Sequence, residues 1–420
     1  MGRDNKDIMD AKTFDVAIIG GGPAGMMASI SAAESGARVI LLEKNKELGK
    51  KLLLTGNARC NITNAEFNLK KLVGNYGKNG KFLFHAFSVF GPKEVIGFFE
   101  GLGVKTKIED NSRVFPASGK AADVLNALKR HLLKNNVAIS FNSQVSRVIS
   151  KNNKIEKLVA GDKEVIAGKY VFCTGGKSYP ATGSTGDGFK WVKDLGHKVS
   201  EPSPALVPLK IKENWDLQGL ALKNAGVSIF QGGKKYFQET GDVLFTHFGL
   251  SGPVILNLSR RVGELLKQGE VRLNLDLFPG LNTKDLDRRI QEKIIKNPKK
   301  SVKGFLADLM PQRLIPVFIK ISGIEAGKQA NNITKKEREA IAKSLKQMEV
   351  TASGLLGFES AMVTSGGVLL KEIDDKTMKS KIIDNLFFAG EMIDIDARTG
   401  GFNLQACWST GYLAGKSAID

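Results

Sequence analysis

The sequence predicts an α/β protein in which a Rossmann-like nucleotide-binding domain is discontinuous and carries an inserted domain, β-barrel-like in one part and helical in another. Three observations support this prediction. A strand, a glycine turn, a helix and a strand follow one another from residue 14, a second strand runs into glycine turns near residue 390, and the pattern changes near residue 204. The length of 420 residues is sufficient for two or three domains of ordinary size.

Residues 14–43 are predicted to form one βαβ unit. Residues 14–19 and 38–43 are short apolar runs, typical of buried parallel strands. Between them, residues 24–34 favour a helix that stops before Gly36. This order of elements within about 30 residues is the βαβ motif that many nucleotide-binding domains share.

Beyond this unit the alternation of strands and helices continues. We expect helices over 93–102 and 120–135, a strand over 137–150, and a strand or hairpin over 163–173. Towards the end of the chain, a further buried strand precedes Gly390, and the last helix is predicted to begin near Asn403. These segments are expected to belong to the same sheet-based domain.

The inserted domain is recognised by short alternating runs with glycine turns, followed by amphipathic helices. We predict a flexible tail at 1–13, the nucleotide-binding domain at 14–203 and 362–420, and the insert at 204–361. Within the insert, β structure is expected over 204–280 and 349–361, and helices over 281–348.

Composition excludes several classes of protein. Three scattered cysteines, Cys60, Cys173 and Cys407, are too few for a disulfide framework or a zinc cluster, so we expect no metal site and a cytoplasmic location. The most apolar stretch, 16–33, is interrupted by glycines and a proline, so we expect no membrane span. The net charge is +19, but the lysine pairs are dispersed and lack an aromatic platform, so nucleic acid is not an expected partner.

The turn at 20–25 has the spacing of a dinucleotide-binding motif. Gly20 makes the tight turn, Gly22 allows the backbone to approach a pyrophosphate, and Gly25 lets the helix pack on the strand. The phosphates are expected at the helix N-terminus, beside Pro23 and Ala24. Glu43 ends the second strand, where an acid accepts hydrogen bonds from a ribose and repels a 2′-phosphate. NAD and FAD therefore remain, and a structural glycine turn is the alternative.

A second segment favours FAD over NAD. Gly390 and Glu391 follow a predicted strand, and residues 399–404 form a glycine turn that opens a helix. FAD is long enough to need a second contact of this kind. Glu391 can hold the ribityl chain, and a helix N-terminus at 401–404 can stabilise negative charge on a reduced flavin. An ordinary closing strand and helix is the alternative.

Several further motifs occur in the same order: 49–51, 55–56 and 59–64, then 174–180 and 182–188, then 245–253, and finally 364–368 and 389–403. With these motifs the sequence resembles, over nearly its whole length, the flavoproteins of the BaiN/aminoacetone-oxidase type. These are bacterial FAD-dependent oxidoreductases of the two-dinucleotide-binding-domain class. In two places the sequence departs from the family pattern: Asn57 and Ala58 occupy a loop that is usually glycine-rich, and Ala397 stands where glycine is usual.

The resemblance implies FAD as the cofactor and an extended set of cofactor-binding residues. They are Gly20, Gly22, Pro23, Ala24, Gly25, Glu43, Lys44, Lys51, Gly56, Arg59, Asn61, Val145, Thr174, Gly175, Gly176, Asp187, Gly390, Glu391, Gly401, Phe402, Asn403 and Leu404. Lys51 and Arg59 are cations suited to a pyrophosphate or a reduced flavin, with a solvated basic loop as the alternative.

Two residues are candidates for chemistry. His247 lies between aromatic residues just before a Gly-Leu-Ser-Gly-Pro turn that could start a helix, and a buried orienting histidine is the alternative. Cys60 has no partner cysteine nearby, so a packing role competes with a chemical one.

The expected activity is flavin-mediated hydride transfer on a small organic substrate, with NAD(P)H as a transient electron donor. The resemblance leaves two substrate types open: reduction of a carbon–carbon double bond, as in an ene-reductase, or oxidation of a small amine. An RNA-associated flavoprotein and a non-catalytic redox sensor are the alternative functions. The oligomeric state stays open.

Overall fold

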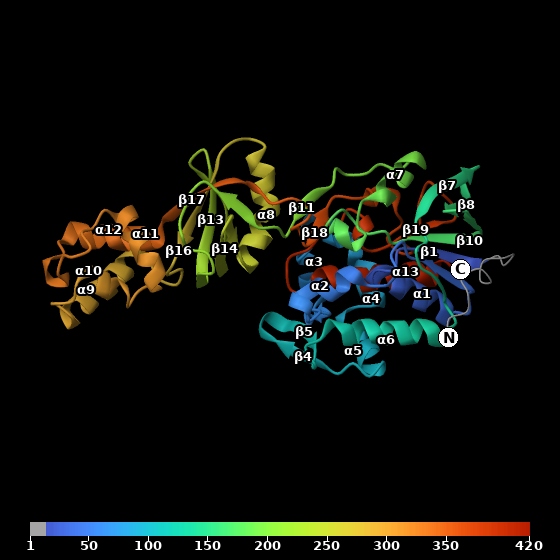
Figure 1. The fold of residues 1–420 in the computed structure, drawn as a ribbon, viewed down its shortest axis with the longest axis horizontal. Helices are drawn as coiled ribbons and strands as arrows, with labels where there is room; N and C mark the ends of the chain where they lie inside the picture. Colours follow the sequence, from blue (N-terminus) through green and yellow to red (C-terminus); the bar gives the residue numbers. More distant parts are fainter. Residues whose placement is uncertain (1–13) are drawn as a thin grey trace. The chain divides into compact units, whose positions relative to one another are not determined.

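The computed structural model describes residues 14–420 (Figure 1), so the tail predicted over 1–13 lies outside the described residues. The chain divides into two compact units. Unit 1 comprises the residues up to Pro204 together with Ala361–Asp420, and unit 2 comprises Ala205–Ser360. None of the helices within 14–420 combines the length and the apolar character needed to cross a membrane.

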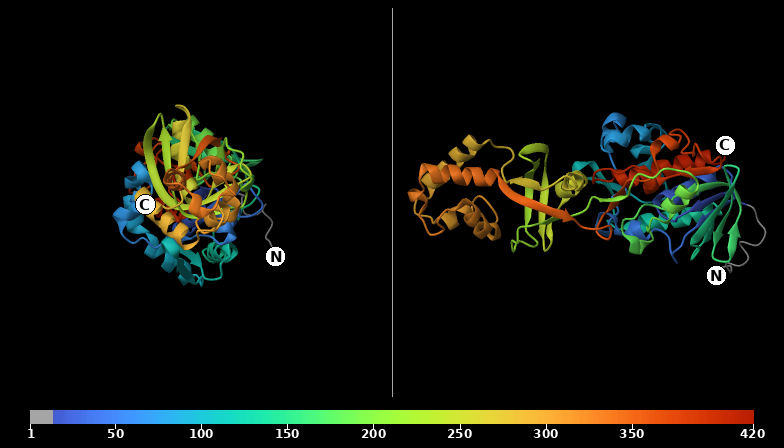
Figure 2. Two further views of the ribbon diagram at one scale, coloured as in Figure 1. Left: turned by 90° about the vertical axis from the view of Figure 1, so that its left-hand side faces the viewer. Right: turned by 90° about the horizontal axis from the view of Figure 1, so that it is seen from above.

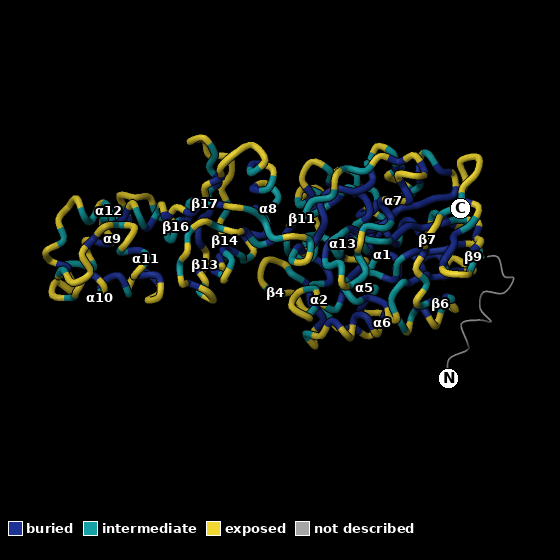
Figure 3. Tube along the Cα trace, turned by 45° about the horizontal axis from the view of Figure 1, so that its top comes forward, coloured by how far each residue is buried: buried dark blue, intermediate teal, exposed yellow. Residues whose placement is uncertain are grey.

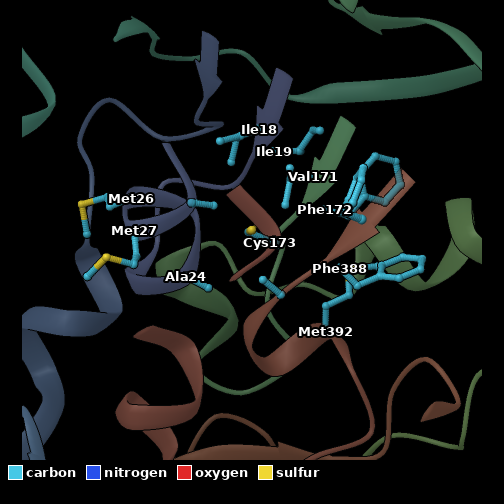
Figure 4. Packing of buried hydrophobic residues seen from close by; sticks show 14 of the residues in the cluster. Ile18, Ile19, Ala24, Met26, Met27, Val171, Phe172, Cys173, Phe388 and Met392 are labelled. Carbon is cyan, nitrogen blue, oxygen red and sulfur yellow. The ribbon is translucent and has the colours of Figure 1, made fainter. Parts of the chain in front are cut away.

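Unit 1 is built on a parallel sheet of five strands in the order β19–β10–β1–β2–β6. The strands are β1 (Phe14–Ile19), β2 (Val39–Leu42), β6 (Ala138–Ser140), β10 (Ala167–Phe172) and β19 (Leu386–Phe388). Most of their side chains are buried, as expected for a sheet covered on both faces. Figure 4 shows Ile18, Val171 and Phe172 packed together with Phe388. This sheet confirms the predicted α/β, Rossmann-like class.

Two helices from opposite ends of the chain pack closely in unit 1, α1 (Pro23–Glu34) and α13 (Phe402–Ser417). A Cβ at Gly411 would lie 2.4 Å from the Ala24 carbonyl oxygen, and one at Gly415 would lie 2.2 Å from that of Ala28. Only glycine therefore permits this approach. Figure 2 shows the red terminal helix within the blue and green elements of this unit.

The rest of unit 1 consists of short helices and small sheets. The helices are α2 (Lys50–Ala58), α3 (Leu69–Gly74), α4 (Phe84–Val89), α5 (Pro92–Gly101), α6 (Ala121–Lys134) and α7 (Asp187–Asp194). The strands are β3 (Thr63–Asn64), β4 (Thr106–Glu109), β5 (Arg113–Pro116), β7 (Val145–Lys151), β8 (Lys154–Ala160), β9 (Lys163–Val165), β11 (Ser203–Ala205) and β18 (Val363–Ser365). The single strand predicted over 137–150 is wrong, because Asn142 adopts a left-handed φ of 51° and separates β6 from β7.

Unit 2 contains a closed barrel of strands in the order β12–β15–β14–β13–β16–β17, in agreement with the β-barrel-like prediction. The strands are β12 (Leu209–Ile211), β13 (Ala221–Gln231), β14 (Lys234–Thr246), β15 (Gly249–Ser251), β16 (Val271–Asp276) and β17 (Met348–Leu355). Helix α8 (Pro253–Leu266) begins directly after Gly252, so the turn preceding it does start a helix.

Between β16 and β17 the chain forms the helical part of unit 2. Its helices are α9 (Thr283–Lys296), α10 (Val302–Leu306), α11 (Ile315–Ser322) and α12 (Lys335–Lys346). Leu286, Phe305, Phe318 and Ile341 are buried in a core that these helices share with the barrel. The outer sides of the helices are largely exposed (Figure 3).

His197 forms hydrogen bonds to a segment of unit 1 that is distant in sequence. Its ring nitrogens lie 3.1 Å from Glu372 Oε2 and 2.9 Å from Ser380 Oγ, and its side chain is fully buried. Burial lowers the pKa of His197 and outweighs the opposing effect of Glu372. The imidazole is therefore neutral in the folded protein near neutral pH.

We expect acid to destabilise the protein through His197. Because its pKa is lower in the folded than in the unfolded state, unfolding takes up a proton as the pH falls below about 6.5. Stability should fall by about 1.4 kcal/mol for each unit by which the pKa is lowered. Thermal melts between pH 8 and pH 5 test this, and His197→Gln should show a flatter dependence. Identical slopes for the two proteins would contradict it.

Candidate cofactor-binding site

A cleft opens at the carboxyl ends of the parallel strands in unit 1. It holds about 900 Å³ of empty space, including its open mouth. The chain passes from β1 to β2 on one side, whereas β10 lies on the other side of β1. In open parallel sheets, ligands bind where the strand order reverses in this way. The topology therefore places a ligand site at this edge of the sheet.

The structure brings part of the predicted set together around this cleft. The lining residues are Gly20, Gly22, Pro23, Ala24, Glu43, Lys44, Lys51, Val145, Thr174, Gly175, Asp187 and Glu391. They come from segments that follow β1, β2, β10 and β19, and from the starts of α1, α2, β7 and α7.

The glycines of the turn after β1 are required for different reasons. Gly20 has a φ of 105°, and a Cβ there would lie 2.5 Å from the Cys173 carbonyl oxygen. A Cβ at Gly25 would lie 1.9 Å from the Gly20 carbonyl oxygen. Gly22 differs, because its φ of −81° suits any residue and a Cβ would meet nothing within 4 Å. Internal packing therefore explains Gly20 and Gly25 but leaves the cleft-lining Gly22 free to face a ligand.

Glu43 is already engaged by the protein. Its Oε2 accepts a hydrogen bond of 2.7 Å from the Gly21 amide, and its Oε1 accepts two from Asn45, at 2.8 and 2.7 Å. A carboxylate has about four acceptor positions. Glu43 thus shapes the turn and keeps capacity for one further donor, such as a ribose hydroxyl.

Lys44 links two loops that line the cleft. Its Nζ lies 2.9 Å from Asp187 Oδ2 and donates to Thr185 Oγ1 at 2.6 Å. Burial raises the pKa of Asp187, but hydrogen bonds from Lys44, Thr185 and Gln144 outweigh it and lower the pKa overall. The carboxylate is therefore ionised at neutral pH, at the first residue of α7.

Lys51 and Glu391 form an ion pair of 2.7 Å on the wall of the cleft. Glu391 also accepts a hydrogen bond of 2.5 Å from the Thr364 amide. The predicted residue Gly176 packs beside this group, since a Cβ there would lie 2.2 Å from Thr364 Oγ1. The network holds the Glu391 carboxylate in one orientation at the side of the cleft.

Asn61 and Gly401 meet at the start of α13. A Cβ at Gly401 would lie 2.3 Å from the Thr63 carbonyl oxygen and 2.9 Å from Asn61 Oδ1. Within residues 14–420, Asn61 Oδ1 is the buried side-chain polar atom that has no hydrogen-bond partner. An unpaired buried acceptor requires an explanation, and a bound group with an N–H donor supplies one. Neither Asn61 nor Gly401 is among the residues that line the cleft as the structure describes it.

Several other predicted residues lie outside the cleft and are engaged in structure. Arg59 stacks over Phe115, 4.2 Å from the ring centroid, and pairs with Glu109. The Asn403 side chain holds the backbone of Ala397, through hydrogen bonds of 2.9 and 3.0 Å.

The remaining predicted residues also pack within unit 1. The Phe402 carbonyl accepts a hydrogen bond of 2.6 Å from Tyr76, and the amide of Gly390 donates one of 2.9 Å to Thr410. Leu404 packs against the core of this unit.

The loop before Arg59 is conformationally unusual. Gly56, Asn57 and Ala58 have φ values of 58°, 56° and 63°, in the left-handed region that favours glycine. This explains why glycines suit the loop and shows that Asn57 and Ala58 keep the same backbone at some cost in strain. α2 is broken at this point, between Thr55 and Asn57.

Neither chemical candidate lines the cleft. Cys60 is fully buried, and burial raises its pKa to about 12 despite a hydrogen bond from Thr55, which favours the packing role over a thiolate. His247 is in unit 2, exposed in the turn between β14 and β15, and its ring lies 4.7 Å from that of Phe248. The proton-transfer role of His247 and its alternative, an orienting role between the insert and the nucleotide-binding domain, both stay predictions.

Sequence reasoning missed other residues of the cleft. Asn45 and Gln144 lie on loops with no motif that marks them as ligands, and Thr185 lies within the motif 182–188 but was not among the residues singled out there. Cys173 and Cys407 also contribute to the lining, and burial raises the pKa of both thiols. Within residues 14–420, no three His, Cys, Asp or Glu side chains are grouped as a metal site.

The residues present fit FAD. The open position beside Gly22 leaves room for a pyrophosphate at the N-terminus of α1, where free N–H groups and the helix dipole favour anions. Glu43 keeps an acceptor position for a ribose. The unpaired Asn61 Oδ1 suits a ring N–H, close to the N-terminus of α13.

Comparison with known proteins agrees with this geometry. The family model for the HI0933-like protein Rossmann domain matches residues 14–417. The chain is 31% identical to the 3-dehydro-bile acid delta(4,6)-reductase of Clostridium scindens, over 96% of this chain and 99% of that protein. It is 30% identical to the ribosomal RNA dihydrouridine synthase of Escherichia coli, over 97% and 98% respectively.

Solved structures share the fold. The 3-ketosteroid delta1-dehydrogenase of Sterolibacterium denitrificans superposes with a TM-score of 0.57 at 13% identity, over 97% of this chain and 100% of that one. At this identity the likeness concerns the fold alone. The chain therefore belongs to the HI0933-like Rossmann family, the BaiN/aminoacetone-oxidase-like FAD-dependent oxidoreductases.

Proposed function

We propose that the protein is an FAD-dependent reductase of a carbon–carbon double bond conjugated to a carbonyl group. The observation that carries the proposal is the cleft at the N-terminus of α1, where Gly22 leaves open space that internal packing does not explain. The names of the Clostridium and Escherichia relatives support it, since each describes saturation of a carbon–carbon double bond. In the overall reaction, the alkene gains one hydride and one proton, and a nicotinamide donor is oxidised.

The chain's own residues would perform the positioning. FAD supplies hydride transfer when bound. The turn at 20–25 and the N-terminus of α1 would hold its phosphates, and Glu43 its ribose. The N-terminus of α13, which begins after Gly401, would stabilise negative charge on the ring. Asn61 would fix the ring orientation through its free acceptor.

NAD(P)H is the proposed electron donor, and it would dock transiently. The sequence has one complete GxGxxG turn, and FAD would occupy the cleft beside it. A second resident dinucleotide therefore has no matching turn of this type in the sequence.

The test is to purify the protein with FAD and mix it anaerobically with NADH or NADPH. We expect the flavin absorbance to bleach and then to return when a conjugated enone is added, with formation of the saturated product. Return of colour with oxygen and consumption of small amines would instead support an amine oxidase. No bleaching with either nicotinamide and no reaction with either substrate class would support a redox sensor and overturn the proposal.

A second candidate substrate belongs to the same chemical class: a uracil base in RNA, whose C5–C6 double bond is conjugated to a carbonyl. Two relatives, from Escherichia coli and Haemophilus influenzae, bear the name ribosomal RNA dihydrouridine synthase, and the net charge of +19 is compatible with a polyanionic partner. Detection of dihydrouridine by mass spectrometry after incubation with RNA and NADPH distinguishes it from a free enone.

A further inference from the structure

The positive charge of unit 2 is concentrated in one part of it. Residues 281–348 contain 16 lysines and arginines against seven aspartates and glutamates. The barrel part, 205–280 with 349–360, contains nine of each. About half of the chain's net charge of +19 is thus carried by the helical part, whereas the barrel beside it is neutral. This asymmetry was hidden by the dispersed appearance of the lysines in the sequence.

Several of these cations gather on α9 and the start of α10. Arg289, Lys293 and Lys296 occupy positions i, i+4 and i+7 of α9, which lie on one side of a helix. Lys299 and Lys303 continue the series towards α10. Figure 3 shows this stretch mostly exposed. We call the five residues the α9–α10 basic face.

Contacts within the protein account for two of the five residues. Arg289 lies over the Phe278 ring, 5.6 Å from its centroid. Lys293 is half-buried and adds to the effect of Lys300 in lowering the pKa of Asp308. Elsewhere in the helical part, Lys300 pairs with Asp308, Lys328 with Glu337, and Arg338 with Asp287. By contrast, among the residues that the structure describes, Lys296, Lys299 and Lys303 are exposed and have no carboxylate within ion-pair distance.

Helix stability accounts for only part of this face. Lys293 and Lys296 lie in the last turn of α9, where cations are favourable. Lys303 lies in the last turn of the short helix α10, where a cation is also favourable. Lys299 lies between the two helices, so its exposed charge is not explained by either of them.

We propose that the α9–α10 basic face binds the phosphate backbone of RNA, an inference that rests on the RNA substrate of the second candidate function. The segment 281–348 has no Tyr or Trp, and its two phenylalanines, Phe305 and Phe318, are fully buried. Base stacking is thus absent from this face, and contact is limited to phosphates. Binding here positions the RNA without reading its sequence.

The test compares two triple variants of the full-length, FAD-loaded protein. The face variant carries Lys296→Gln, Lys299→Gln and Lys303→Gln and so loses three charges from the α9–α10 basic face. The barrel variant loses three charges from exposed positions of the neutral barrel part, through Lys210→Gln, Lys234→Gln and Lys267→Gln. Binding of a fluorescein-labelled RNA hairpin is measured by polarisation between 50 and 200 mM salt. Thermal melting and enone reduction check that both variants are intact.

We expect the face variant to bind the hairpin at least tenfold more weakly at 0.1 M salt. The slope of log K against log[salt] should fall by about 2 to 3, because each phosphate contact contributes about 0.7 to 0.9. The barrel variant should bind like the wild type. If both triple variants lose affinity for the hairpin equally, or if neither does, the proposal that the α9–α10 basic face binds RNA is wrong. Should the face variant lose structure, Lys299→Gln alone, in the connecting loop, should lower the slope by about one.

Other outcomes separate the inference from the proposed function. If the wild type binds phosphatidylserine vesicles through this face but not RNA, the partner is a membrane surface and the RNA proposal falls. If RNA does not bind but enones are reduced, the reductase stands and this inference fails. If RNA binds through the face but neither enones nor uridine are reduced, the proposed function fails while the face stands.

Discussion

Replacing Gly22 with valine is expected to give a folded protein that no longer retains FAD. The backbone at Gly22 is extended, with φ −81° and ψ −175°, which a β-branched residue adopts readily. The new side chain would meet no protein atom within 4 Å of its Cβ and would occupy the cleft instead. Overpacking against a phosphate costs about 3 kcal/mol, which corresponds to roughly 10²-fold weaker binding.

The measurement is the flavin-to-protein absorbance ratio after purification, followed by titration of the apo-protein with FAD. Gly97→Val is the matched control, because a Cβ at this exposed position of α5 also meets nothing within 4 Å. The control should stay yellow. If Gly22→Val binds FAD as tightly as the control, the cofactor does not approach the N-terminus of α1 as we infer.

Replacing Gly411 with valine is expected to produce the largest loss of stability of any change considered. The side chain would collide with the Ala24 carbonyl oxygen, which lies 2.4 Å from the position of the new Cβ. Backbone of α1 cannot move aside without disturbing the sheet beneath it, so we expect a loss of about 4 kcal/mol or more. For a domain of this size the melting temperature should fall by roughly 8–16 °C.

Thermal melts in saturating FAD separate this effect from loss of the cofactor. Lys416→Val, at an exposed position of the same helix, controls for the low helix propensity of valine. Equal melting temperatures for the two variants would show that α1 and α13 do not depend on the glycine contact. If Gly411→Val is insoluble, Gly411→Ala takes its place. Its melting temperature should also lie below that of Lys416→Val, by a smaller margin.

Some features of the site were predictable because they are local in sequence. The turn at 20–25, the helix that follows it and the acid at Glu43 lie within one βαβ unit, so spacing alone indicates their geometry. The reason why each position of the turn requires glycine was not predictable from the sequence. Gly20 is required by contact with Cys173, more than 150 positions away, and only Gly22 is left open.

Contacts between distant segments carry no local signal. Lys44 meets Thr185 across 141 positions, and Lys51 meets Glu391 across 340. The side of the cleft formed by Asn45, Gln144 and Thr185 is assembled only when β2, β7 and α7 come together. For the same reason Arg59 and Asn403, which motifs place in the cofactor-binding set, are engaged in structural contacts outside the cleft.

The sequence by itself determined the class of the protein, the turn that receives a dinucleotide and the boundaries within which an insert is expected, because hydrophobic periodicity and turn chemistry are local properties of a chain. The tertiary structure alone decided which side chains share the cleft, which are occupied by internal ion pairs, and which cations remain exposed on α9 and α10. These outcomes depend on packing between segments far apart in sequence, and packing is settled only when the chain folds.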